Sequence, residues 1–160
     1  MTGQEEREAV YRAENRVVEE GYLTDDELSI LPGEVAAWCS AIAHSAGWGT
    51  YAPPHFRNVV PPVFTVAFDL PNGNPELDEL AGYYESATDT IHLDPRIVDR
   101  WKVLHELAHA LDCRDAHGTG FQERMVELVG AAFGDETADA LRDAYEYELA
   151  ALWGHADAGT

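Results

Sequence analysis

Basic residues are scarce in this chain of 160 residues, which has 10 Lys and Arg against 30 Asp and Glu. Lys102 is the one lysine. The resulting net charge of −20 repels the phosphates of nucleic acids and the surfaces of anionic membranes. We therefore expect no nucleic acid and no membrane as a partner, and a preference for neutral or basic molecules over acidic ones.

Cysteines and long apolar runs are scarce as well. Cys39 and Cys113 lie far apart and in no CxxC arrangement, so the sequence lacks the pattern of a zinc finger. Reduced thiols are the favoured state, and the spacing alone leaves a disulfide between them open. No apolar run reaches about 18 residues, and the acidic N-terminal residues precede no apolar segment. These absences predict a cytoplasmic protein without a membrane span or secretory signal, and they leave the oligomeric state undetermined.

Apolar residues spaced with a period of 3.6 predict a mostly helical α+β chain that forms one domain over residues 1–160. The first expected helix has a narrow apolar stripe, so we expect residues 1–22 to be a peripheral helix. Residues 154–160 are expected to form a frayed tail. The helices that the periodicity predicts cover residues 5–20, 34–46, 96–113, 121–133 and 135–153.

Strand patterns are confined to the middle of the chain. Residues 63–68 are β-branched and aromatic over the length of a strand, which predicts a strand there. Residues 82–85 and 90–93 flank a short polar turn and predict an antiparallel hairpin. The expected β structure is therefore a small antiparallel sheet or a hairpin, which would lie beside the helix over residues 96–113.

The segment His105-Glu106-Leu107-Ala108-His109 has the HExxH pattern of a metal-binding helix. Histidines four residues apart lie on nearly the same face, about 6 Å apart along the axis, so both imidazoles can reach one metal ion. Glu106 lies beside this pair, where a general base can take a proton from metal-bound water. The pattern predicts a Zn²⁺ site with His105 and His109 as ligands and Glu106 as the catalytic base.

A hydrolytic zinc site needs a third protein ligand and an open fourth position. His117, which lies eight residues after His109, is the first candidate. The glycines at positions 118 and 120 permit the tight backbone path that returns its imidazole to the helix.

Two further sets of carboxylates compete with His117 for this place. Asp115 is the alternative third ligand, because it lies ten residues after His105, the spacing used by one large class of zinc peptidases. That class turns the chain with a glycine three residues after its second histidine, where this chain has Asp112. Glu123 and Glu127 rank third, since other classes use a glutamate ligand. Asp112 and Asp115 are also candidates for orienting a ligand histidine from behind.

The remaining histidines and the tyrosines near these patterns are expected to be structural or exposed, because such residues are more often core or surface groups than ligands. The histidines are His44, His55, His92 and His155. The tyrosines, which are possible donors to an oxyanion, are Tyr83, Tyr145 and Tyr147.

The run from His105 to Phe121 resembles the HExxH and HGxxF signature of SprT-like and WLM-type zinc peptidases, and of small metallopeptidases from actinobacteria and their phages. The resemblance extends over about residues 82–128 and implies a zincin-like fold with an edge strand beside the substrate cleft. It implies the three histidines as ligands, Glu106 as the base and Phe121 as a packing residue. SprT-like proteins often carry a zinc ribbon, whose CxxC pairs are absent here, so no DNA-linked substrate is inferred.

These patterns together predict a zinc-dependent metallopeptidase that binds an extended peptide along the hairpin by strand addition. A second class of function stays open. A zinc site can also stabilise a non-catalytic binding or regulatory protein, and the acidic surface would then dock a basic partner.

Overall fold

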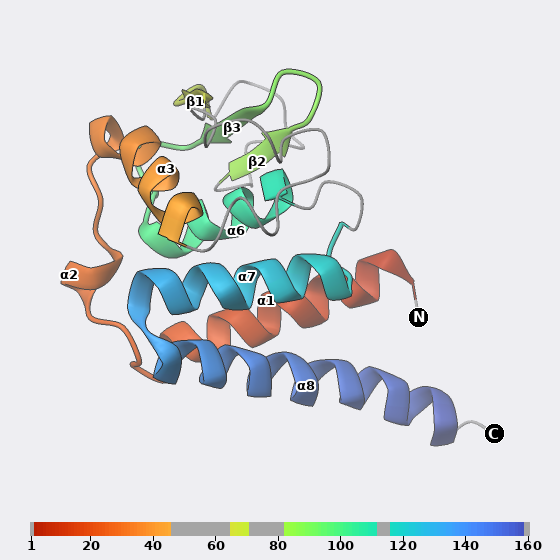
Figure 1. Cartoon of the computed structure of the whole chain (residues 1–160). Coiled ribbons are helices and arrows are strands. Elements are labelled where there is room, and N and C mark those ends of the chain that lie inside the picture. The colour runs from red at the N-terminus through yellow and green to blue at the C-terminus, as the bar shows by residue number, and fades with distance from the viewer. Residues whose placement is uncertain (1, 46–64, 71–81, 112–115, 159–160) are drawn as a thin grey trace.

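The computed structural model describes residues 2–45, 65–70, 82–111 and 116–158, and Figure 1 shows their arrangement. The chain is mostly helical with a small sheet, which confirms the expected α+β class. The helices are α1 (Gly3–Glu19), α2 (Asp25–Leu28), the 3-10 helix η1 (Pro32–Glu34), α3 (Val35–Ser45), α6 (Arg100–Leu111), α7 (Thr119–Phe133) and α8 (Asp135–Ala158). The strands are β1 (Thr65–Ala67), β2 (Gly82–Glu85) and β3 (Thr90–Leu93).

The three strands form one sheet in the order β1-β3-β2. β2 and β3 pair antiparallel, which confirms the predicted hairpin. β1 pairs parallel to β3, so the sheet is mixed and the expectation of a purely antiparallel sheet is wrong. A hairpin has a local signal in its turn, whereas the direction of a long-range pairing such as β1 with β3 has none.

Helix α6 lies between the sheet and a layer formed by α1, α7 and α8 (Figure 1). Because it is covered on both sides, it buries nine of its twelve residues, including His105 and Glu106. The most buried of its neighbours are large apolar side chains of the sheet and of α7, which include Ile91, Leu93, Phe121, Met125 and Leu128. The segment with the HExxH pattern is therefore the centre of the core.

Helix α1 belongs to this core, and its predicted peripheral position is wrong. It packs along α8 and buries Ala9, Val10, Ala13 and Val17 almost completely. Ala9 and Ala13 widen the narrow apolar stripe of α1, and their small side chains let α1 and α8 approach closely. On the flank of this contact, the Glu148 carboxylate of α8 accepts bonds from two arginines of α1, at 3.1 Å from Arg12 and 2.8 Å from Arg16.

Several helix boundaries follow from local capping groups. α1 ends just before Gly21, whose φ of 79° suits glycine. α6 begins at Arg100 and not near residue 96, because the Asp99 side chain accepts a bond from the Lys102 amide at 2.8 Å and so caps the helix. α8 continues to Ala158, so residues 154–158 are helical where the sequence predicts a frayed tail. Within the described ranges, no helix is long and apolar enough to cross a membrane.

Candidate metal centre

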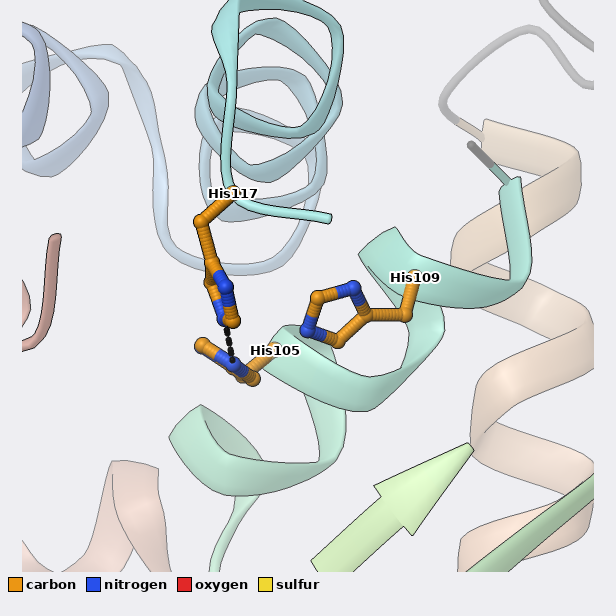
Figure 2. A group of neighbouring side chains, drawn as sticks. All are labelled: His105, His109 and His117. Atoms are coloured by element: carbon orange, nitrogen blue, oxygen red, sulfur yellow. Dashed lines mark hydrogen bonds between the residues drawn. The ribbon is translucent and has the colours of Figure 1, made fainter. Parts of the chain in front are cut away.

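Three histidines meet at one point between α6 and the start of α7. His105 and His109 come from successive turns of α6, and His117 comes from the residues just before α7, as Figure 2 shows. One ring nitrogen from each lies within 4.8 Å of the other two. The Nε2 atoms of His105 and His117 are 3.4 Å apart. The three side chains lie close enough to bind a metal ion.

The three imidazoles are packed against an aromatic floor. Phe121, in the first turn of α7, is fully buried and lies with its ring centroid 4.9, 4.5 and 5.1 Å from those of His105, His109 and His117. Tyr11 of α1 stacks on His105 at 5.1 Å with an interplanar angle of 15°. These contacts restrict how far the rings can rotate, which keeps their nitrogens directed at one another.

A buried carboxylate supports the cluster from behind. The Nδ1 of His105 donates to Glu14 Oε2 at 2.8 Å, and the hydroxyl of Tyr145 donates to Glu14 Oε1 at 2.7 Å. Glu14 exposes 3% of its surface and His105 exposes 5%. Sequence reasoning missed Glu14, although a signal exists. It lies four residues after Val10 and three before Val17, so a carboxylate occupies the apolar stripe of α1.

Glu106 lies beside the histidines and is almost fully enclosed, with 7% of its surface exposed. The pKa of its carboxyl is raised to about 7, chiefly by burial, which the charge of His105 opposes and the charge of Glu14 reinforces.

The two histidines of α6 differ in their preferred charge. Burial, together with the neighbouring charges of His105, His117 and Arg7, lowers the pKa of His109 to about 3. Burial also disfavours a charged His105, but the charge and hydrogen bond of Glu14 outweigh it and raise the pKa of His105. His109 thus presents a neutral imidazole, the form that binds metal.

His109 and His117 line a cleft of about 330 Å³ beside strand β2. Glu106, residues of β2, and Arg7 and Tyr11 of α1 line it as well, whereas His105 lines a neighbouring cleft. A second cleft of about 470 Å³ shares Arg7, Tyr11, Gly82 and Glu106 with the first. Glu106 therefore lies between two adjoining hollows, along which an extended chain could pass.

Gly82 permits the close approach of β2 to α6. A Cβ atom at this position would lie 2.8 Å from Leu93 Cδ2, 3.0 Å from the His92 carbonyl oxygen and 3.2 Å from Glu106 Cγ. In the described part of the chain β2 is an edge strand that pairs with β3 alone, and its residues line the cleft.

The competing carboxylates are placed differently from His117. Asp112 and Asp115 lie outside the described residues. Glu123 is exposed on α7, and Glu127 pairs with Arg124 at 3.0 Å. Among the described residues, the group that can hold a metal contains neither glutamate. Both line a separate cavity of about 660 Å³ between α7 and α8, and the three histidines are not part of the described lining of that cavity.

The other aromatic candidates have structural contacts. The hydroxyl of Tyr145 donates a hydrogen bond to Glu14. Tyr147 is exposed, and the guanidinium of Arg16 lies over one face of its ring. Tyr83 stacks on His92, with ring centroids 4.4 Å apart. Both nitrogens of His92 face carboxylates, Nδ1 at 2.9 Å from Asp69 and Nε2 at 3.0 Å from Glu85. The side chains of His44, His55 and His155 lie outside the described set.

Comparison of this chain with protein-family models, with curated proteins and with solved structures found no match.

Proposed function

We propose that this protein is a zinc-dependent metallopeptidase with a zincin-like fold, in which His105, His109 and His117 hold the ion and Glu106 is the general base. The observation that carries the proposal is the meeting of three imidazole nitrogens within 4.8 Å, beside a carboxylate and an open cleft. Three protein ligands with an accessible side are the arrangement of catalytic zinc sites, whereas structural sites are closed by four.

The donor set suits zinc in its chemistry and spacing. Imidazole nitrogens favour zinc and its transition-metal neighbours over calcium or magnesium. Nitrogens bound at about 2.0–2.1 Å to one tetrahedral ion lie about 3.3 Å apart, and the Nε2 atoms of His105 and His117 are 3.4 Å apart. The buried Glu14 carboxylate has no Lys or Arg ion-pair partner among the described residues, so its charge complements a cation held by His105.

A zinc ion held by the three histidines would acidify a water molecule toward neutral pH and polarise a carbonyl oxygen. Glu106 is the group that would take a proton from the attacking water and give it to the nitrogen of the leaving amine. The enclosed position of Glu106 limits competing solvent around this carboxylate. His105 and His109 supply fixed imidazoles from one helix, and His117 completes the set from the next segment.

An extended peptide is the substrate form that fits the cleft. The edge strand β2 offers backbone donors and acceptors along one side, so a peptide can add to the sheet as a strand and pass Glu106. Because the chain carries a net charge of −20, neutral or basic peptides are favoured over acidic ones.

The test is a comparison of Glu106→Gln with the wild-type protein on a pool of denatured proteins, with and without a chelator. Glu106→Gln should keep one equivalent of zinc and lose turnover by about 10²–10⁴-fold, the usual contribution of a general base. The exposed Glu8 of α1 provides a matched control, and Glu8→Gln should keep both zinc and turnover.

Two results would contradict the proposal. Undiminished cleavage by Glu106→Gln would remove the residue from the mechanism. One equivalent of zinc in the wild-type protein with no cleavage under any condition would favour the binding class, in which the ion stabilises the fold and the acidic surface docks a basic partner.

A further inference from the structure

We infer that Glu14 is a positioning residue for the metal ligand His105. Helix α1 thereby contributes a residue to the metal centre. The inference rests on the proposed zinc site. It assigns a role to a carboxylate that lies 91 residues from His105 in the chain and outside the HExxH region.

The hydrogen bond between Glu14 and His105 selects which ring nitrogen is left for the metal. A carboxylate only accepts, so the bond of 2.8 Å places a proton on Nδ1 of His105. The opposite nitrogen, Nε2, is then the acceptor in the 3.4 Å hydrogen bond with Nε2 of His117, and a metal ion bound between the two rings would replace that proton. Glu14 thereby fixes both the tautomer and the direction of the ligand, and its negative charge strengthens the donor.

Glu14 is itself held in place from a third helix. Tyr145 of α8 donates to the second carboxylate oxygen at 2.7 Å, so each oxygen of Glu14 has one donor. The stacked ring of Tyr11 covers one face of His105. Rotation of the imidazole would therefore break a hydrogen bond and an aromatic contact together, which makes the orientation of His105 rigid before any ion binds.

Glu148 provides a control that distinguishes an effect of Glu14 on the orientation of His105 from an effect on the packing of α1 against α8. Glu148 of α8 is also nearly buried and also joins α8 to α1, through Arg12 and Arg16. Its described partners are these two arginines, and it makes no contact with the three histidines. If Glu14 only held α1 against α8, loss of either carboxylate would have the same effect on zinc.

The experiment compares Glu14→Gln, Glu148→Gln and Tyr145→Phe in the full chain. The glutamine variants keep the shape of the side chain and remove its charge. Three quantities are measured: the dissociation constant for zinc by competition with a chromogenic chelator, the visible absorption spectrum of the Co²⁺-loaded protein, and the melting temperature of the metal-free protein.

We expect Glu14→Gln to weaken zinc binding by about 10–100-fold, the range for groups that orient a metal ligand, and to change the Co²⁺ spectrum. Tyr145→Phe should weaken zinc binding less, because Glu14 keeps its bond to His105. Glu148→Gln should lower the melting temperature of the metal-free protein and leave both the zinc constant and the Co²⁺ spectrum unchanged.

Wild-type zinc affinity and an unchanged Co²⁺ spectrum in Glu14→Gln would overturn the inference. So would an equal loss of affinity in Glu148→Gln, which would assign the effect to packing of α1. A wild-type protein that binds no zinc would overturn both the inference and the proposed function. A wild-type protein that binds zinc without cleaving peptides would refute the peptidase alone, because the effect of Glu14 on affinity is measured without turnover.

Discussion

His105 and His92 are both buried histidines held by carboxylates, yet they are arranged for opposite purposes. His105 gives one nitrogen to Glu14 and directs the other at His109 and His117. His92 has both nitrogens facing carboxylates, Asp69 on one side and Glu85 on the other. The second nitrogen of His105 is bonded to another imidazole, His117, with which it can share a metal ion, whereas the second nitrogen of His92 is bonded to another carboxylate.

The difference shows that a carboxylate neighbour alone does not identify a ligand histidine. What identifies it is the environment of the second nitrogen, which must be unprotonated and face further donors. The same contrast extends to burial, because Glu14 is enclosed while Asp69 and Glu85 keep 49% and 41% of their side chains exposed. Water screens the bonds of His92 and leaves those of His105 strong.

The sharpest way to break this comparison is to replace each histidine with glutamine. His105→Gln should weaken zinc binding by more than roughly 100-fold, beyond the range for orienting groups, because a ligand itself is lost. His92→Gln should keep one equivalent of zinc at wild-type affinity. Metal analysis after dialysis measures both, and comparable losses in the two variants would show that the distinction between them is wrong.

Removal of the metal tests the same contrast through stability. At a free zinc concentration about 1,000 times the dissociation constant, binding adds about 4 kcal/mol to the stability of the folded state. For a protein of this size that corresponds to a melting temperature about 8–16 °C higher than in excess chelator. The shift should persist in His92→Gln and fall to about a third or less in His105→Gln. Differential scanning fluorimetry with and without chelator measures it, and a chelator-independent wild type would contradict the prediction.

Gly82 lies between the strand that carries His92 and the helix that carries His105, since a Cβ at Gly82 would contact both the His92 carbonyl and Glu106 Cγ. Gly82→Ala should displace Glu106 by a few tenths of an ångström, retain zinc, and lower turnover by up to about 100-fold, as small misplacements of catalytic groups do. Gly33→Ala is the matched control, because a Cβ at Gly33 meets nothing within 4 Å. Equal turnover in the two variants would show that this contact is unimportant.

The smallest expected effect is the pH dependence of the His92 bonds. Burial opposes its charged form, but hydrogen bonds and charges from Asp69 and Glu85 outweigh it and raise the pKa of His92. Its contribution to stability is therefore complete below the unfolded pKa, about 6.5, and is lost as the pH rises through the higher folded pKa. The partners are exposed, so we expect less than about 1 kcal/mol.

Melting temperatures of the wild type and His92→Gln across about pH 6 to 9 measure this effect. The difference between them should be greatest at the acidic end, at no more than about 4 °C, and should shrink toward the alkaline end. A difference that grows with pH would mean that His92 is neutral in the folded protein.

The parts of the fold that the sequence predicts are those with a local signal. The hairpin of β2 and β3 and the end of α1 just before Gly21 lie where short patterns predict them. The parallel direction of β1 and the burial of α1 do not follow from local patterns. They depend on which distant segment covers each face, and α1 meets α8 only after the whole chain has folded back.

The residues of the candidate metal centre also fall into two groups, those that local sequence patterns predict and those that only the tertiary fold brings together. His105, His109 and Glu106 follow from helical periodicity, and His117 follows from its glycine-flanked loop. Glu14 does not, because its pairing with His105 is a property of the tertiary fold. The order of preference between His117 and Asp115 stays a prediction, since Asp115 lies outside the described residues.

The long sequence separations within the centre also affect how the protein is made. Glu14 and His105 are 91 residues apart, and Glu14 and Tyr145 are 131 residues apart. Contacts of such range form late, and during synthesis they wait for the last segment to emerge. A ribosome-bound chain that lacks α8 has its three histidines but not the helix that anchors Glu14. The support of His105 by Glu14 and Tyr145 therefore cannot form until almost the whole chain has been made.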